Sequence, residues 1–310
     1  MQFFKSTNIN FIKNHRKYLA VSGLLLLMAI AVFIYRGGPN YGIDFTGGML
    51  MQIFFQDSNV DLKDVRHAVE ESGVKSFELQ SSENFIIIRA KKNVESREEF
   101  ENLVKNSIQS KFQNNTVTVG KVEYVGPSVG KYLSKQAIFA FLFAFLGMIV
   151  YVAFRFKSVV WGVAAIIGII FDVIMSFGFV VFANKEVSII VVAALLTVAG
   201  YSINDTIVLF DRIKENLKFY AKESFAAVMN KSMNQVLVRT VVTALTVFFV
   251  SCSLFFLGGE VLHTFAYIMV IGTVLGVFSS IFICIPLVYE CETRRINRIK
   301  IENNAKDKKF

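Results

Sequence analysis

Six long apolar runs dominate this 310-residue sequence and limit the folds open to it. The hydrocarbon core of a bilayer is about 30 Å thick, so a helix that crosses it needs roughly 20 consecutive apolar residues. A soluble protein could bury one such helix, but five in close succession leave no polar faces for water. We therefore predict an α-helical polytopic membrane protein with one span before, and five spans after, a polar segment. The predicted spans are residues 18–35, 136–154, 158–183, 188–210, 236–257 and 264–289.

The first apolar run has a second interpretation, as a cleaved signal peptide. Ala29-Ile30-Ala31 has the small residues typical of a cleavage site. Apolar residues continue through Tyr35, however, which is longer than a signal peptide requires. We therefore favour a retained membrane anchor, and cleavage would leave the other five spans unchanged.

Lysine and arginine gather in alternate connections between the runs. Basic residues in short connections are retained on the cytoplasmic side of a membrane. They are frequent in residues 1–17, 211–235 and 290–310, whereas residues 184–187 and 258–263 contain only Lys185. Both termini are therefore predicted to be cytoplasmic tails, with residues 36–135 outside. Because topology explains most of the net charge of +9, no nucleic-acid partner is expected.

Two other features of the composition restrict the function. Residues 211–235 are charged and helix-prone, with apolar side chains on one side, which predicts a cytoplasmic interfacial helix. The three cysteines, Cys252, Cys284 and Cys291, show no CxxC spacing and have no histidine pair nearby. We therefore expect neither a disulfide framework nor a metal site, and no cofactor.

The polar segment between the first two spans alternates between strand-like and helix-like periods. Strands are predicted at residues 49–55, 76–80, 84–90 and 116–125, and helices at 61–72 and 96–112. This βαββαβ order is typical of a ferredoxin-like fold. The segment is therefore predicted to be a small α+β domain outside the membrane.

Glycine-rich motifs frame this domain on both sides. They make turns at the membrane exits, or they act as hinges that let the domain swing. A phosphate-binding loop does not fit, because no GK[ST] sequence follows. The candidate hinge residues are Gly42, Asp44, Gly47, Gly48, Gly126, Pro127 and Gly130.

Three ionisable residues, Asp172, Asp205 and Arg239, fall within the apolar spans. Each such group costs about 2.5–3.5 kcal/mol at the membrane centre, so it needs a partner or water. Asp205 and Arg239 are predicted at similar depths on consecutive antiparallel helices, where they could pair and form a proton relay. The alternatives are a snorkelling Arg239 and an Asp205 that only marks a helix end. Asn204 adds a polar group, although it points about 100° away from Asp205.

Asp172 allows two interpretations. It lies roughly 21 Å from the cytoplasmic face, so it takes part in proton conduction or accepts a structural hydrogen bond from another helix. A third hypothesis combines Asp172 and Asp205 into an intramembrane aspartyl protease. No GxGD sequence occurs, and Asp205 lies only about 9 Å deep, which disfavours the protease.

Gly272 and Gly276 have GxxxG spacing, which predicts close helix packing.

Six sequence segments, in this order along the chain, resemble the SecF family of bacterial protein translocase subunits, which is related to the RND superfamily. The similarity covers nearly the whole chain, and residues 200–212 are its most specific part. The segments are 41–48 (YGIDFTGG), 126–130 (GPSVG), 154–156 (FRF), 200–212 (GYSINDTIVLFDR), 234–240 (NQVLVRT) and 276–283 (GVFSSIFI).

The resemblance implies a function and a set of partners. It implies a subunit in the bacterial inner membrane that joins SecD, and that uses the proton-motive force to help export unfolded polypeptides through the SecYEG channel. YajC is a further candidate partner. Protons would be the coupling ion, and the chain would perform no chemical catalysis of its own. The alternative is a stand-alone RND-like exporter of lipids or small amphiphiles, which the single small outer domain disfavours.

The resemblance also assigns roles to residues. Asp205 and Arg239 match the proton-coupling site of the family, which is shared with an acidic residue of SecD. Members of the family usually have histidine before the aspartate that matches Asp172, whereas this chain has Phe171. A histidine-assisted relay at that point is therefore not expected here.

Overall fold

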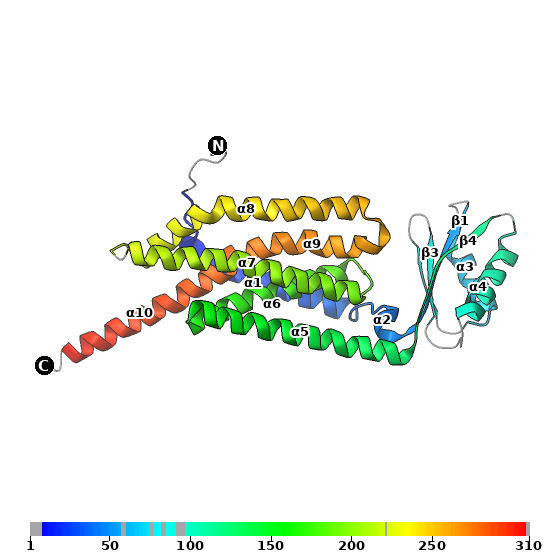
Figure 1. The fold of residues 1–310 in the computed structure, drawn as a ribbon, viewed down its shortest axis with the longest axis horizontal. Coiled ribbons are helices and arrows are strands. Elements are labelled where there is room, and N and C mark those ends of the chain that lie inside the picture. The colour runs from blue at the N-terminus through cyan, green and yellow to red at the C-terminus, as the bar shows by residue number, and fades with distance from the viewer. Residues whose placement is uncertain are drawn as a thin grey trace. The chain divides into compact units, whose positions relative to one another are not determined.

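The structure is a computed structural model, and it describes residues 8–56, 60–74, 77–81, 85–90, 97–113, 115–220 and 222–307. The chain divides into two compact units. The helical unit contains Met1–Asn40 and Phe141–Phe310, and the sheet unit contains Tyr41–Ala140. Their helices and strands are labelled in Figure 1.

Six helices in the described part of the chain are long and apolar enough to cross a membrane. The strands fall between the first and the second of these helices, which confirms the predicted one-plus-five order. The last of the six contains a π-helix, a wider turn that interrupts regular α-helical hydrogen bonding. The bounds are α1 His15–Tyr35, α5 Pro127–Phe156, α6 Val159–Phe182, α7 Ile189–Phe219, α8 Phe225–Leu257, α9 Gly259–Ser279, the π-helix Ser280–Cys284 and α10 Ile285–Asp307.

The centre of the helical unit is formed by α6, α7 and α9. Helix α9 packs against α6, α7 and α8, and α1 packs against α6. A Cβ added at Gly272 of α9 would lie 2.2 Å from Cγ2 of Val198 on α7, and one at Gly276 would lie 3.3 Å from Cβ of Ser202. These glycines therefore let two helices approach more closely than larger residues would permit.

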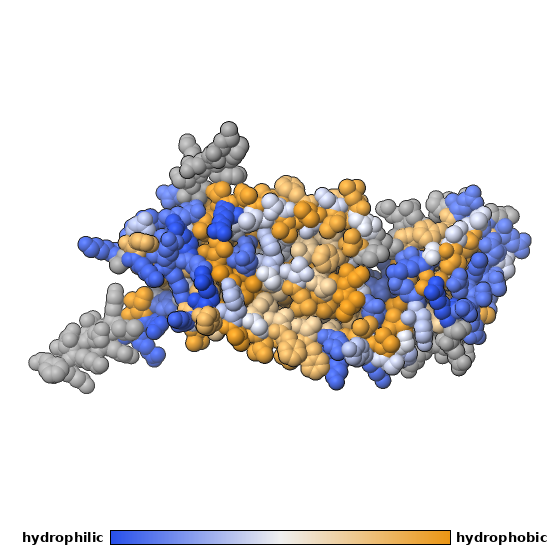
Figure 2. Space-filling view, in the orientation of Figure 1, coloured by the Kyte–Doolittle hydropathy of each residue, from blue (hydrophilic) through white to orange (hydrophobic). Residues whose placement is uncertain are grey.

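The surface of the helical unit is divided by polarity. On the face drawn in Figure 2, hydrophobic residues cover the middle of the unit, and hydrophilic residues cover the end that carries α10 and the connection between α7 and α8. Large apolar side chains remain exposed along α1, α5 and α8, among them Leu24, Phe143 and Phe249. An apolar middle with a polar end is the pattern expected for a bundle that lies in a bilayer.

Residues 211–235 do not form the separate interfacial helix expected from the sequence. Helix α7 continues to Phe219 and α8 begins at Phe225, so the two spans share this segment. The apolar faces of both extensions explain the difference, because Ile213 and Met229 are buried in the same core cluster. Ser224 caps α8, since its side chain accepts a hydrogen bond from the backbone N–H of Ala227.

The described residues of the predicted N-terminal tail are packed against the bundle. Phe11 and Ile12 are buried in its core. Asn234 of α8 accepts from the backbone N–H of Ile9 at 2.9 Å and donates to its carbonyl at 2.8 Å. Asn230 accepts from the backbone N–H of Ile12 at 3.1 Å. We call residues 9–12 the N-terminal clamp, because these contacts fix them to α8.

The predicted C-terminal tail also begins as ordered structure. Residues 290–307 continue helix α10, so the helix does not end at residue 289, where the predicted span ends. Glu290 lies 3.0 Å from Nε2 of His15 at the start of α1, and Glu292 accepts a hydrogen bond of 3.2 Å from Nε1 of Trp161 at the start of α6. These polar contacts anchor the first turns of α10 to two other helices.

The sheet unit confirms the predicted ferredoxin-like βαββαβ fold. Its four strands have the order β2-β3-β1-β4, and all neighbours are antiparallel. Val65 and Val104, from the two longer helices, are buried against the sheet together with Ile53 and Ile88. The elements are β1 Gly48–Phe55, α3 Leu62–Glu71, β2 Phe77–Ser81, β3 Ile86–Ala90, α4 Arg97–Lys111 and β4 Val117–Val125, preceded by the short helix α2 Ile43–Thr46.

The two glycine-rich motifs pack against each other within the sheet unit. A Cβ at Gly47 would lie 3.0 Å from Cα of Pro127, and one at Gly130 would lie 3.0 Å from the backbone nitrogen of Gly47. Gly48 has φ +134, and a Cβ added there would lie only 2.5 Å from the carbonyl oxygen of Ala90. The sequence predicted turns or hinges at these two motifs. In the structure their glycines permit close backbone contact in a single joint, and hinge motion at this joint stays a prediction.

Candidate functional site

Asp205 lies on the buried face of α7. It is 2% exposed, and its Oδ2 has no hydrogen-bond partner in the part of the chain that the structure describes. The neighbouring Asn204 is exposed, as the rotation of about 100° per residue requires. Asp205 is therefore a buried carboxyl without a cationic partner among the residues that the structure describes.

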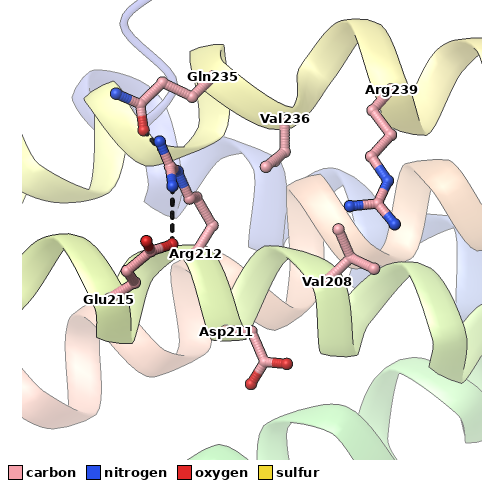
Figure 3. A pocket seen from close by; sticks show the side chains of 7 residues that line it. All are labelled: Val208, Asp211, Arg212, Glu215, Gln235, Val236 and Arg239. Carbon is pink, nitrogen blue, oxygen red and sulfur yellow. Dashed lines mark hydrogen bonds and ion pairs between the residues drawn. The ribbon is translucent and has the colours of Figure 1, made fainter.

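Arg239 of α8 does not pair with Asp205. Its side chain is exposed, and in Figure 3 it reaches toward Val208 of α7. Val208 lies three residues nearer the end of α7 than Asp205, which is about 4.5 Å along the helix axis. The predicted depths of Asp205 and Arg239 were therefore close. The two side chains do not form the predicted pair, because the guanidinium of Arg239 lies about one helical turn nearer the end of the bundle than Asp205.

Arg239 instead lines a cavity between α7 and α8 with a volume of about 420 Å³. Figure 3 shows the side chains of this cavity. Arg212 binds two other polar residues of the lining, since it donates hydrogen bonds to Gln235 at 2.8 Å and to Glu215 at 2.7 Å. Among the described residues, the guanidinium of Arg239 has no such partner. The full lining is Val208, Asp211, Arg212, Glu215, Gln235, Val236 and Arg239.

Asp172 belongs to a separate polar cluster at the centre of the bundle. It is 0% exposed, and its Oδ2 accepts hydrogen bonds from Ser202 of α7 and Ser279 of α9, the second at 2.7 Å. Its Oδ1 has no partner among the described residues. Beside it, Thr206 and Ser280 are hydrogen-bonded to each other at 2.8 Å. Asp172 therefore accepts the structural hydrogen bonds that one interpretation of the sequence expected.

The contacts of Ser202 and Ser279 with Asp172 were not predicted from the sequence, although both serines lie in segments that carried the resemblance. Ser279 directly precedes the π-helix Ser280–Cys284. Such wide turns are frequent at functional sites, but an apolar run gives no periodic signal for them.

Phe171, where histidine is usual in the family, is 4% exposed and stacks on Phe278, with ring centroids 6.1 Å apart. This position therefore contributes aromatic packing in this chain.

Comparison with known proteins agrees with this architecture. Residues 93–294 match the family model described as protein export membrane protein SecD/SecF, C-terminal. Residues 32–57 match the SecD/SecF GG motif, which contains the Gly47-Gly48 pair. Together the two models cover most of the helical unit and the glycine-rich joint.

Curated relatives match along almost their whole length. The protein translocase subunit SecF of Endomicrobium trichonymphae is 65% identical over 301 residues, which are 97% of this chain and 97% of that protein. The protein of the same name from Thermodesulfovibrio yellowstonii is 38% identical over 294 residues, or 93% and 96% of the two chains. Full-length similarity to translocase subunits disfavours the stand-alone exporter.

Solved structures of SecDF share the fold. The crystal structure of SecDF from Thermus thermophilus, titled a translocon-associated membrane protein, has a TM-score of 0.82 and 34% identity and covers 93% of this chain. A structure of SecDF in a super-membrane-facing form has a TM-score of 0.73 and 33% identity. This chain spans only 39% and 41% of the lengths of those chains. The chain belongs to the SecD/SecF family of protein export membrane proteins, as a SecF-type protein translocase subunit.

Proposed function

We propose that this subunit joins SecD in the bacterial inner membrane and couples proton movement to polypeptide export through SecYEG. The observation that carries the proposal is Asp205, a buried carboxyl whose Oδ2 has no partner in the described chain. A charged carboxylate held in this way is costly, whereas a bound proton removes the charge. Asp205 is therefore suited to bind and release one proton, and no cofactor is required.

Asn204 and Arg239 support a partner that covers α7 and α8. Both side chains are exposed, and neither has a hydrogen-bond partner among the described residues. Lipid tails cannot satisfy an amide or a guanidinium, so a second protein with a complementary acidic residue fits this face. SecD is the partner that the family suggests. Asp205, Arg239 and Asn204 would then form the proton-coupling site between the two subunits.

Asp172 is proposed as a second, deeper participant. It connects α6, α7 and α9 through Ser202 and Ser279, so a change in its protonation would alter contacts among three helices. Its free Oδ1 supports this role, since a purely structural carboxyl usually has both oxygens bound. A proton crossing roughly 150 mV releases about 3.5 kcal/mol. That free energy shifts a conformational equilibrium roughly 100-fold or more.

The proposed orientation places both termini in the cytoplasm and the sheet unit outside. It rests on the basic residues at the ends of α5, α7 and α10, compared with the single Lys185 between α6 and α7. We further propose that the sheet unit moves in response to protonation and contacts the emerging polypeptide. YajC is a further proposed member of the assembly, and the chain itself is proposed to perform no covalent chemistry.

The test compares export driven by the proton-motive force in membranes that carry SecD with this subunit or its variants. Asp205→Asn and Arg239→Met should each remove most of the proton-dependent export while the variants remain stably inserted. Asp64→Asn is the matched control, because Asp64 is an exposed residue of α3 in the sheet unit. Full proton-dependent export by the Asp205→Asn variant would refute the coupling role.

A further inference from the structure

The cavity between α7 and α8 is lined by Val208, Val236 and Arg239 among other residues. Each of the two valines lies about one helical turn along its helix from a residue with a buried polar atom. Oδ2 of Asp205 and Oγ1 of Thr240 are buried without hydrogen-bond partners among the described residues, and each residue is 2% exposed. Neither residue lines the cavity.

Sequence spacing places the two valines between the cavity and these atoms. Asp205 precedes Val208 by three residues in α7, and Thr240 follows Val236 by four in α8. The separations along the helix axes are therefore about 4.5 Å and 6 Å. Because α7 and α8 run in opposite directions, both valines lie on the cytoplasmic side of the unpartnered atoms.

The cavity has room and polarity for water. Its volume of about 420 Å³ is many times the roughly 10–15 Å³ that one water requires on the same measure. Glu215 and Gln235 provide polar contacts nearer the end of the bundle. Water has polar partners along this cavity, and Val208 and Val236 are its apolar lining residues.

We propose that this cavity is the cytoplasmic outlet for the proton that Asp205 carries, and that Val208 and Val236 form an apolar barrier across it. This inference rests on the proposed function of Asp205. When the barrier admits water, the O–H bond of the Asp205 carboxyl breaks, the carboxylate remains, and the proton passes to a water in the cavity. The positive charge of Arg239 favours the carboxylate and disfavours a hydronium ion beside it.

Accessibility to a thiol reagent tests the outlet without measuring coupling. Val208→Cys and Gln235→Cys are introduced into a chain in which Cys252, Cys284 and Cys291 are alanine, assembled with SecD in inverted vesicles. Ile207→Cys is the matched control, since Ile207 precedes Val208 by one residue on α7 and is half-buried like Val208. Ile207 does not line the cavity.

A membrane-impermeant maleimide added from the cytoplasmic side should label Gln235→Cys fastest. It should label Val208→Cys at least tenfold faster than Ile207→Cys. Equal rates at positions 208 and 207 would overturn the outlet. That failure is distinct from failure of the proposed function, which the export assay of Asp205→Asn measures.

A bulky side chain at the barrier provides the functional arm. Val208→Phe fills part of the cavity and should lower proton-dependent export at least fivefold, while Ile170→Phe, at an exposed position of α6, leaves export unchanged. Membrane abundance of both variants, and the labelling of Gln235→Cys in the Val208→Phe chain, show whether the fold is intact. Full export by an intact Val208→Phe variant would overturn the outlet even if Asp205→Asn is inactive.

Discussion

Ser279 of α9 donates a hydrogen bond of 2.7 Å to Oδ2 of Asp172 on α6, where both residues are 0% exposed. Ser202 of α7 donates to the same oxygen. The π-helix begins at the next residue, Ser280, whose hydroxyl lies 2.8 Å from that of Thr206 on α7. Ser279 and Ser280 therefore contact α6 and α7, respectively. The carboxyl of Asp172 connects α6, α7 and α9 at the centre of the bundle.

Replacement of Ser279 should weaken this centre. Ser279→Ala removes one donor from a buried carboxyl, which should lower the free energy of unfolding by about 1–3 kcal/mol. Thermal unfolding in mild detergent measures the loss. Ser253→Ala is the control, because Ser253 is exposed on α8 and its hydroxyl donates to the carbonyl of Phe249 in its own helix. Equal losses in the two variants would contradict a special role for the Asp172 contact.

Gly272→Ala should separate α9 from α7. The new Cβ would lie 2.2 Å from Cγ2 of Val198, and such overpacking typically costs about 1–3 kcal/mol. Val198→Ala in the same chain should recover part of the loss, which a double-mutant cycle would measure. Gly147→Ala on α5 is the control, since nothing lies within 4 Å of the added atom. Absence of any coupling between positions 272 and 198 would contradict the close approach.

The fold could be predicted because it depends on signals that are local in sequence. Runs of about 20 apolar residues identify membrane spans, and alternating periods identify the strands and helices of the sheet unit. The connection between α7 and α8 was predicted incorrectly, because a charged segment with one apolar side fits a separate interfacial helix as well as it fits the extended ends of two spans. Ile213 and Met229, one on each extension, become buried only when the helices pack together in the bundle.

The site could be predicted only in part, because tertiary packing sets rotation and contact partners. Asp205 and Arg239 were identified from their depth, but depth does not determine which way a side chain points. Arg239 extends into the cavity rather than toward Asp205. Ser279 lies in an apolar run, where one hydroxyl leaves the hydrophobic pattern intact. The contact between Asn234 and Ile9 joins residues that are 225 positions apart, so no local pattern indicates it.

Lys185 should make stability depend on pH. It lies between α6 and α7, outside the spans, and burial lowers the pKa of its ammonium group from the ordinary 10.5. Its Nζ lies 3.2 Å from Nδ1 of His263 and 5.0 Å from the ring centroid of Tyr267. Between the folded and unfolded pKa values, the unfolded chain binds more protons, so the free energy of unfolding rises as the pH increases through that window.

Lys185→Gln should remove this part of the rise. Denaturant unfolding at about pH 8 and about pH 10 would measure the slope, which follows the difference in bound protons. Lys105→Gln, at an exposed position of α4, should keep the slope of the parent chain. An unchanged slope in Lys185→Gln would show that burial of this ammonium group does not affect folding.

Asn234→Ala should release the N-terminal clamp from α8. The substitution removes both hydrogen bonds to the main chain of Ile9, each of which contributes about 0.5–1.5 kcal/mol. Amide exchange at Ile9 should therefore accelerate roughly five- to 100-fold, since the two bonds total about 1–3 kcal/mol and 1.4 kcal/mol corresponds to a factor of ten. Asn106→Ala, at an exposed position of α4, is the control and should leave Ile9 unchanged. Because Asn230 holds Ile12 independently at 3.1 Å, protection at Ile12 should fall less than at Ile9. Equal loss at both amides would mean that the clamp opens as one unit, and no loss at Ile9 would mean that Asn234 does not hold it.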